Sequence, residues 1–250
     1  MLADVDRRSG LRVTCVLLLT VVSALGSACS ADVPSSDPSV GGTRTNDATA
    51  ASSDASETAE CAPPQVCGGP MPPGSYVSTS IGPTVEFEVG EDWSGGGDLA
   101  GEGFFLLDRS QRAPAAMTVT VFPGEVFSDP CSVGPTEPVG AGAADAAEWV
   151  TSLDFLDADA SASVMVGGRE AVQVDVTVTI GDACADPVVY LWPLPVSQEF
   201  HLNEGEQARF IFVDAGTRTL AYIIEAFPDA DWSGFLNRAT AVLETMTVAD

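Results

Sequence analysis

The string Asp229-Ala-Asp231-Trp-Ser233-Gly234 has the clearest chemical meaning in this sequence. Two carboxylates two positions apart, followed by a hydroxyl and a glycine, match the first half of a calcium-binding loop, whose alternate oxygens turn toward the ion. Such a loop needs a bidentate carboxylate at its twelfth position, where this sequence has Thr240. The competing interpretation is that Asp229 or Asp231 caps the helix that follows. The sequence favours the cap, so we expect no cofactor, with calcium at Asp229, Asp231 and Ser233 as the alternative.

Catalytic groups are scarce in this chain. The sequence has one histidine, His201, and no lysine, which excludes a two-histidine metal site, Schiff-base chemistry and a phosphate-loop lysine. His201 precedes a turn, an ordinary place for an edge-strand histidine, and no Gly-x-Ser-x-Gly pattern supplies a nucleophile. Paired carboxylates can hydrolyse glycosides, but the sequence does not single out two among its many acids. We therefore expect no enzymatic activity, with a glycan-acting hydrolase as an alternative.

The amino-terminal region predicts export. An uncharged run, 13–25, follows three arginines, and its roughly 13 residues suit a signal-peptide core but fall short of the ~20 that a spanning helix needs. The small residues before Cys29 resemble a bacterial lipobox, in which the cysteine carries the lipid. A cut by ordinary signal peptidase after Ala28, releasing a secreted protein, is the alternative. We expect a signal peptide over 1–28 and a lipid on Cys29 that anchors the protein to the outer face of the cell membrane.

The region 29–74 is expected to be a low-complexity tether. Much of it consists of Ser, Ala, Asp, Thr, Gly and Pro, a composition that cannot bury enough apolar surface to offset its ordering entropy. Four cysteines follow Cys29, and an even number in an exported chain predicts two disulfides among three connectivities. The favoured pairs are Cys61–Cys67, a short loop within the tether, and Cys131–Cys184, whose cysteines lie near Asp-Pro turns.

The charge of the chain restricts its partners. The sequence has 36 acidic and 10 basic residues, a formal net charge of −26. Because binding of phosphates requires Lys and Arg to neutralise them, such a chain is repelled by nucleic acid and by anionic lipid headgroups. The expected partners are the membrane, through the lipid on Cys29, and an unidentified envelope protein or glycan. Nucleic acid is not expected.

The region 75–250 predicts a single α+β domain. Alternating apolar and polar residues predict strands, of which 172–180 is the clearest, and 208–214 and 219–227 are apolar on both faces. Apolar stripes at three- and four-residue spacing predict helices over 143–153 and 231–246. We expect a mainly antiparallel sheet of about seven to nine strands covered by two helices. Further strands are predicted at 76–77, 85–89, 103–108, 117–121, 163–166 and 188–192, and a mobile loop at the glycine-rich stretch 95–103.

The order of these features resembles a group of exported actinobacterial lipoproteins. The shared features are a lipobox-like start, a Ser/Thr/Asp tether, an early hairpin that ends near a tryptophan, and a carboxy-terminal helix. Short motifs fit as well, namely Asp129-Pro130-Cys131, Glu148-Trp149, Val166-Gly167-Gly168 and Phe227-Pro228. Some of these lipoproteins have a Mog1/PsbP-like domain, an antiparallel sheet covered by helices. The resemblance spans about residues 75–248; it implies a cell-envelope protein and provides no catalytic residues.

Overall fold

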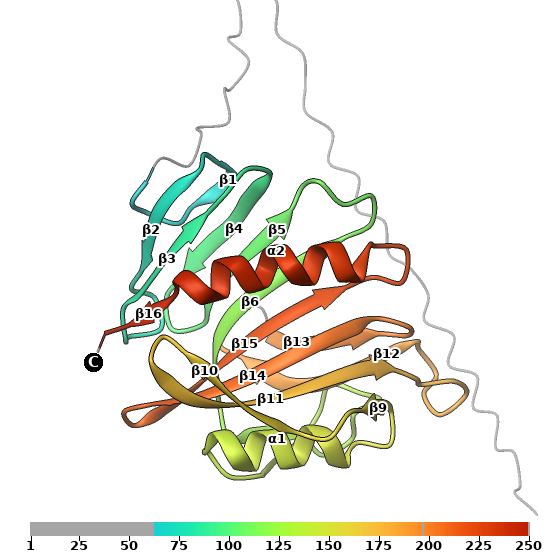
Figure 1. Cartoon of the computed structure of the whole chain (residues 1–250). Coiled ribbons are helices and arrows are strands. Elements are labelled where there is room, and N and C mark those ends of the chain that lie inside the picture. The colour runs from blue at the N-terminus through green and yellow to red at the C-terminus, as the bar shows by residue number, and fades with distance from the viewer. Residues whose placement is uncertain (1–62, 197, 250) are drawn as a thin grey trace, which may run out of the picture. The chain divides into compact units, whose positions relative to one another are not determined.

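The computed structural model describes residues 63–196 and 198–249 (Figure 1). The helices are α1 (Ala143–Ser152) and α2 (Trp232–Thr245). The strands are β1 (Gly68–Met71), β2 (Gly74–Ser78), β3 (Val85–Val89), β4 (Trp93–Leu99), β5 (Gly103–Asp108), β6 (Ala115–Phe122), β7 (Glu125–Phe127), β8 (Thr136–Pro138), β9 (Leu156–Ala158), β10 (Ala162–Val166), β11 (Arg169–Val178), β12 (Val188–Leu194), β13 (Gln198–Asn203), β14 (Gln207–Ala215), β15 (Arg218–Ala226) and β16 (Thr247–Val248). No helix among these residues is long and apolar enough to cross a membrane.

One large antiparallel sheet organises the domain. Its order is β1-β4-β5-β6-β15-β14-β11-β10, and β9 pairs with β11 as a ninth strand. Consecutive strands pair through tight turns, such as the β10–β11 turn at Gly167 and Gly168, where both φ angles are positive. Smaller sheets are formed by β2, β3 and β16, by β12 and β13, and by β7 and β8. The predicted fold, α+β with a mainly antiparallel sheet and two helices, is confirmed.

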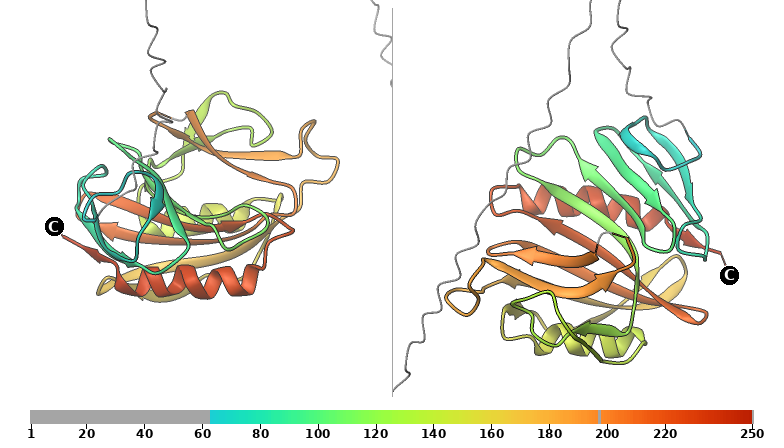
Figure 2. Two further views of the ribbon diagram at one scale, coloured as in Figure 1. Left: turned by 90° about the horizontal axis from the view of Figure 1, so that it is seen from above. Right: turned by 180° about the vertical axis from the view of Figure 1, so that it is seen from behind.

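The large sheet is apolar on both faces because both faces are covered. In β15, Leu220, Tyr222 and Ile224 belong to one hydrophobic core, and Ala221 and Ile223 belong to a second. The first core also contains buried residues of α2 and of the β2–β3–β16 sheet. The second contains buried residues of α1 and of the β12–β13 hairpin. Figure 2 shows α2 and this hairpin on opposite sides of the sheet.

Residues 95–99 of the glycine-rich stretch lie in a strand, so the predicted loop is wrong over this part, and only 100–102 form a turn. Residues Trp93–Leu99 form β4, which pairs with β1 on one side and β5 on the other. A Cβ on Gly96 would lie 1.7 Å from Cζ of Phe105 on β5, and a Cβ on Gly95 would lie 2.3 Å from the carbonyl oxygen of Cys67. Glycine is required here because a ring and a main chain pack directly on the strand, a contact that local sequence does not reveal.

The cysteines provide one direct test of the sequence predictions. Cys131 and Cys184 form a disulfide with a Cα–Cα distance of 5.2 Å, as predicted. The signal peptide over 1–28, the lipid site Cys29 and the Cys61–Cys67 pair, through Cys61, lie outside the described residues. Within the stretch 29–74, assigned above to the tether, Gly68–Met71 forms β1 at the edge of the large sheet.

Candidate ligand-binding pocket

A cavity of about 380 Å³ lies on the second face of the large sheet, between β5, β6 and β15 and the β12–β13 hairpin. The hairpin and α1 cover the rest of this face, where their apolar side chains form the second core. The residues that line the cavity are Leu99, Glu102, Gly103, Phe104, Phe105, Leu107, Pro114, Ala115, Ala116, Thr118, Val119, Thr120, Leu194, Glu199, Phe200, His201, Asn203, Glu206, Glu225 and Phe227.

The walls of the pocket are largely apolar. Alternation along β5 sends Phe104 and Leu106 into the first core and leaves Phe105 and Leu107 on the opposite face. Leu107 is 38% exposed and Phe227, just after β15, is 40% exposed. These are large apolar side chains to leave in contact with water, and burying them under a ligand would be favourable at about 25 cal/mol per Å².

Glu102 ties the hairpin to the rim of the pocket. This side chain, in the loop between β4 and β5, is only 6% exposed. Its Oε2 accepts a hydrogen bond of 3.1 Å from the backbone N–H of Val196, in the segment that joins β12 to β13. Its backbone oxygen accepts a bond of 2.6 Å from Oγ1 of Thr120 on β6. Because charge-assisted hydrogen bonds are the stronger kind, this contact holds the hairpin over the cavity.

Glu206 is buried at the turn between β13 and β14. Gly205 has a φ of 77° there, and its missing side chain leaves room for Pro228. Oε2 of Glu206 accepts a 2.8 Å bond from N–H of Asn203, and Oε1 accepts a 3.0 Å bond from Nδ2 of the same residue. Burial raises the pKa of Glu206, while the bonds from Asn203 and the charge of His201 act to lower it. The turn thus fixes a carboxyl group at the pocket wall.

Glu225 has the most perturbed acid group at this site. It lies on β15 opposite Ala208 of β14 and Ala116 of β6, and these two small neighbours leave space around it. Its Oε2 is buried and accepts no hydrogen bond from any residue in the described part of the chain. Burial, together with the smaller effect of the nearby charge of Glu206, raises the pKa of Glu225 to about 8. At neutral pH this side chain is therefore mainly protonated.

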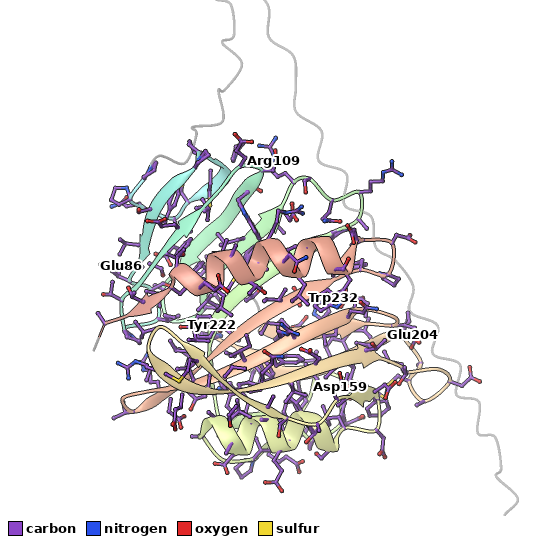
Figure 3. The ribbon with its side chains drawn as sticks, in the orientation of Figure 1. Glu86, Arg109, Asp159, Glu204, Tyr222 and Trp232 are labelled. Carbon is purple, nitrogen blue, oxygen red and sulfur yellow. A yellow bond between two sulfur atoms is a disulfide. The ribbon has the colours of Figure 1, made fainter. Side chains whose placement is uncertain are left out.

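The charged lining of the pocket is acidic. Glu102, Glu199, Glu206 and Glu225 line it, and neither Arg nor Lys does. By contrast, the exposed Glu204 lies at the edge of the domain (Figure 3), where its Oε2 accepts the backbone N–H groups of Ile180 and Gly181. The acidic character of the cavity therefore comes from these lining glutamates, of which Glu225 carries its full charge only above about pH 8.

The structure brings one of the sequence candidates to this site. His201, on β13, lines the pocket with an exposed side chain whose ring lies 5.9 Å from that of Tyr190. The string 229–234 lies outside the lining. Oδ1 of Asp231 accepts 3.1 Å bonds from N–H of Gly234 and from the hydroxyl of Ser233, so Asp231 caps α2. No group of three or more His, Cys, Asp or Glu within the described ranges is arranged to hold a metal ion.

The sequence contains a signal for Glu225, although the predictions from sequence did not include this residue. From position 220 to position 226 strand β15 is apolar on both faces except for Glu225. Charged side chains are almost never buried without a partner, so a lone acid in a doubly covered strand indicates a special environment. For Glu102 and Glu206 no comparable local signal exists, because both lie in polar turns that look solvent-exposed in sequence.

The comparisons with known proteins add little at this level. No protein-family model matches the chain, and a search of curated proteins finds no match. Among solved structures, the chain is similar to the solution structure of cyanobacterial PsbP (CyanoP) from Synechocystis sp. PCC 6803, with a TM-score of 0.41 and 16% sequence identity. The match covers 74% of this chain and 98% of that chain.

Proposed function

We propose that this chain is a non-enzymatic binding protein of the cell envelope, whose domain takes up a small, largely apolar molecule in the pocket described above. The observation that carries the proposal is the cavity itself, about 380 Å³ with phenylalanine and leucine walls. Pockets for small molecules are concave, mostly apolar and supplied with a few convergent polar groups, and this cavity combines all three properties. The pocket lining contains no serine, cysteine or lysine, so the usual nucleophiles are missing from it.

A neutral fluorescent probe tests this proposal. N-phenyl-1-naphthylamine, whose emission rises in apolar surroundings, is expected to bind the purified protein at one site. A Thr118→Trp substitution places a large ring on the pocket face of β6 and is expected to abolish the signal. The matched control is Ser163→Trp, at an exposed position of β10, which should bind as the parent does. Equal binding by all three proteins would refute the assignment of the pocket.

A hydrolase remains the second candidate, because the pocket holds two neighbouring acids. Glu225, largely protonated at neutral pH, has the property of a general acid, and Glu206 would be its partner. The apolar walls favour the binding role over glycan hydrolysis, since a site for a sugar needs hydrogen-bonding groups around the ring. Turnover of glycan substrates that is lost in Glu225→Gln would support the hydrolase and overturn the binding role.

The same proposal places the protein outside the cytoplasm. The uncharged run 13–25 and the lipobox-like residues before Cys29 support a lipid anchor on the outer face of the membrane. There the protein binds or supports another component of the cell envelope. A Cys29→Ser variant is expected to lose incorporation of labelled palmitate, whereas a Cys15→Ser variant should incorporate it as the parent does. Incorporation by Cys29→Ser equal to that of the parent would contradict the lipid site.

A further inference from the structure

The acids in the pocket differ in how far their hydrogen-bonding capacity is used. Oε2 of Glu102 already holds the amide of Val196. Each oxygen of Glu206 accepts one bond from Asn203, although a carboxylate oxygen can accept two. Oε2 of Glu225 accepts none from any residue in the part of the chain that the structure describes, although it is buried. A buried acceptor without a donor is costly, so this wall favours a ligand that brings donors.

The charge of the pocket restricts that ligand further. Four glutamates line the cavity, and neither Arg nor Lys is among the lining residues. An anionic ligand would meet like charge in a partly open cavity, where solvent screens the repulsion only in part, and a neutral ligand would gain nothing from the acidic lining. A cation with N–H groups would supply both the missing donors and the missing charge.

The walls determine that the cation is organic. Phe105, Leu107 and Leu194 line the cavity and offer a surface for an apolar body. The described ranges hold no group of three acids, histidines or cysteines suited to an inorganic cation, which binds through several oxygens at once. Phenylalanine faces also attract ammonium groups through their quadrupole.

We propose that the pocket is selective for an organic cation, an apolar molecule with one protonated amine, whose ammonium group is bound by the carboxyl groups of Glu206 and Glu225. This inference rests on the proposed binding function and assigns the chemical class of its ligand. The apolar body lies against the walls from β5 and β12, and the amine points toward the Glu206 and Glu225 side. His201, exposed and close enough for its charge to act on Glu206, then lies beside the polar end of the ligand.

Three probes of equal chain length separate the charge from the apolar contribution. Isothermal titration of the purified protein with n-octylammonium, n-octanol and n-octanoate is expected to give the tightest binding for octylammonium, at least tenfold tighter than octanol. Octanoate is expected to bind most weakly. At pH 9 the carboxyl group of Glu225 is ionised and octylammonium still carries its proton, so Glu225→Gln and Glu206→Gln should each weaken octylammonium about tenfold there and leave octanol unchanged. The matched control, Glu148→Gln at an exposed position of α1, should change none of the three.

The outcomes distinguish this inference from the function on which it rests. Equal affinities for the three probes would overturn the cation selectivity and leave an apolar pocket in place. If no probe binds, the proposed binding function itself fails. Competition by millimolar calcium chloride that is lost in Glu225→Gln would assign the acids to a metal ion and overturn the organic cation. If Glu206→Gln disturbs the turn that Glu206 forms with Asn203, the result for Glu225→Gln alone tests the cation selectivity, because Glu225 takes no part in the hydrogen bonds of that turn.

Discussion

Replacing Glu225 by glutamine tests the electrostatics of the pocket without a ligand. Burial, with the charge of Glu206 as a smaller cause, raises the pKa of Glu225 from 4.5 to about 8 in the folded protein. The folded state therefore binds the proton more tightly than the unfolded chain does. This contribution to stability is complete below pH 4.5 and is lost as pH rises through about 8. Glutamine resembles the protonated acid and does not titrate, so Glu225→Gln should abolish this loss of stability at high pH.

The size of the effect follows from the pKa difference. One pKa unit corresponds to about 1.4 kcal/mol, so the rise from 4.5 to about 8 corresponds to about 5 kcal/mol between acidic and alkaline pH. By pH 7 about 3 kcal/mol of this stability has been lost. The unfolded chain is stabilised by releasing the proton, whereas the folded protein still holds it. Strongly perturbed pKa values cluster at functional sites, so this cost at neutral pH agrees with the binding role proposed for the pocket.

Urea unfolding at pH 5, 7 and 9 measures this difference. At pH 5 the parent and Glu225→Gln are expected to have nearly equal free energies of unfolding. At pH 9 the variant is expected to be more stable by several kcal/mol, with Glu148→Gln as the exposed control that follows the parent. Parallel pH profiles for the parent and Glu225→Gln would refute the reasoning, because the carboxyl group would then have to be solvated or paired in the folded protein.

Two further predictions concern the frame that carries the pocket. Joint replacement of Cys131 and Cys184 by serine opens a loop that spans 53 residues and should lower the free energy of unfolding by about 4 kcal/mol. Unfolding of the parent with and without reductant measures the same quantity. An unchanged unfolding midpoint would contradict this prediction. Gly96→Ala places a methyl group inside the ring of Phe105 and should destabilise the protein by about 1–3 kcal/mol. Its control is Gly68→Ala, where a methyl group meets nothing within 4 Å; thermal unfolding of both variants should separate them, and equal melting temperatures would contradict the packing argument.

Much of the fold is predictable from the sequence because strand and helix patterns are local. The predicted strand 103–108 agrees with β5, and the predicted helix 143–153 agrees with α1 within one residue at its end. The apolar run 219–227 correctly indicates a strand covered on both faces. The disulfide between Cys131 and Cys184 is one of the pairs that the Asp-Pro turns beside the cysteines favour, and it is present in the structure. Each of these signals lies within a few residues of the element that it predicts.

The glycine-rich strand β4 shows where local reasoning fails. Glycines usually indicate loops, yet Gly95 and Gly96 lie in a strand. They are glycines because the ring of Phe105 and the main chain at Cys67 occupy the space that their side chains would need. The pocket is missed for a similar reason. Glu206 comes from a turn and Glu225 from the far strand of the next hairpin, 19 positions along the chain.

The sequence by itself determines an acidic α+β domain with a covered antiparallel sheet, and it favours the Cys131–Cys184 disulfide, because periodicity, composition and turn residues act over short distances. Only the tertiary structure decides that the β12–β13 hairpin folds back over β5, β6 and β15 and that the amide of Val196 fixes it to Glu102. This arrangement leaves a cavity whose wall contains the buried Glu206 and the buried Oε2 of Glu225. The reason is physical: burial and the mutual charge of Glu206 and Glu225 arise from contacts between distant segments. In the sequence Glu206 does not differ from its many exposed counterparts, and the apolar run around Glu225 indicates an unusual environment without identifying the segments that create it.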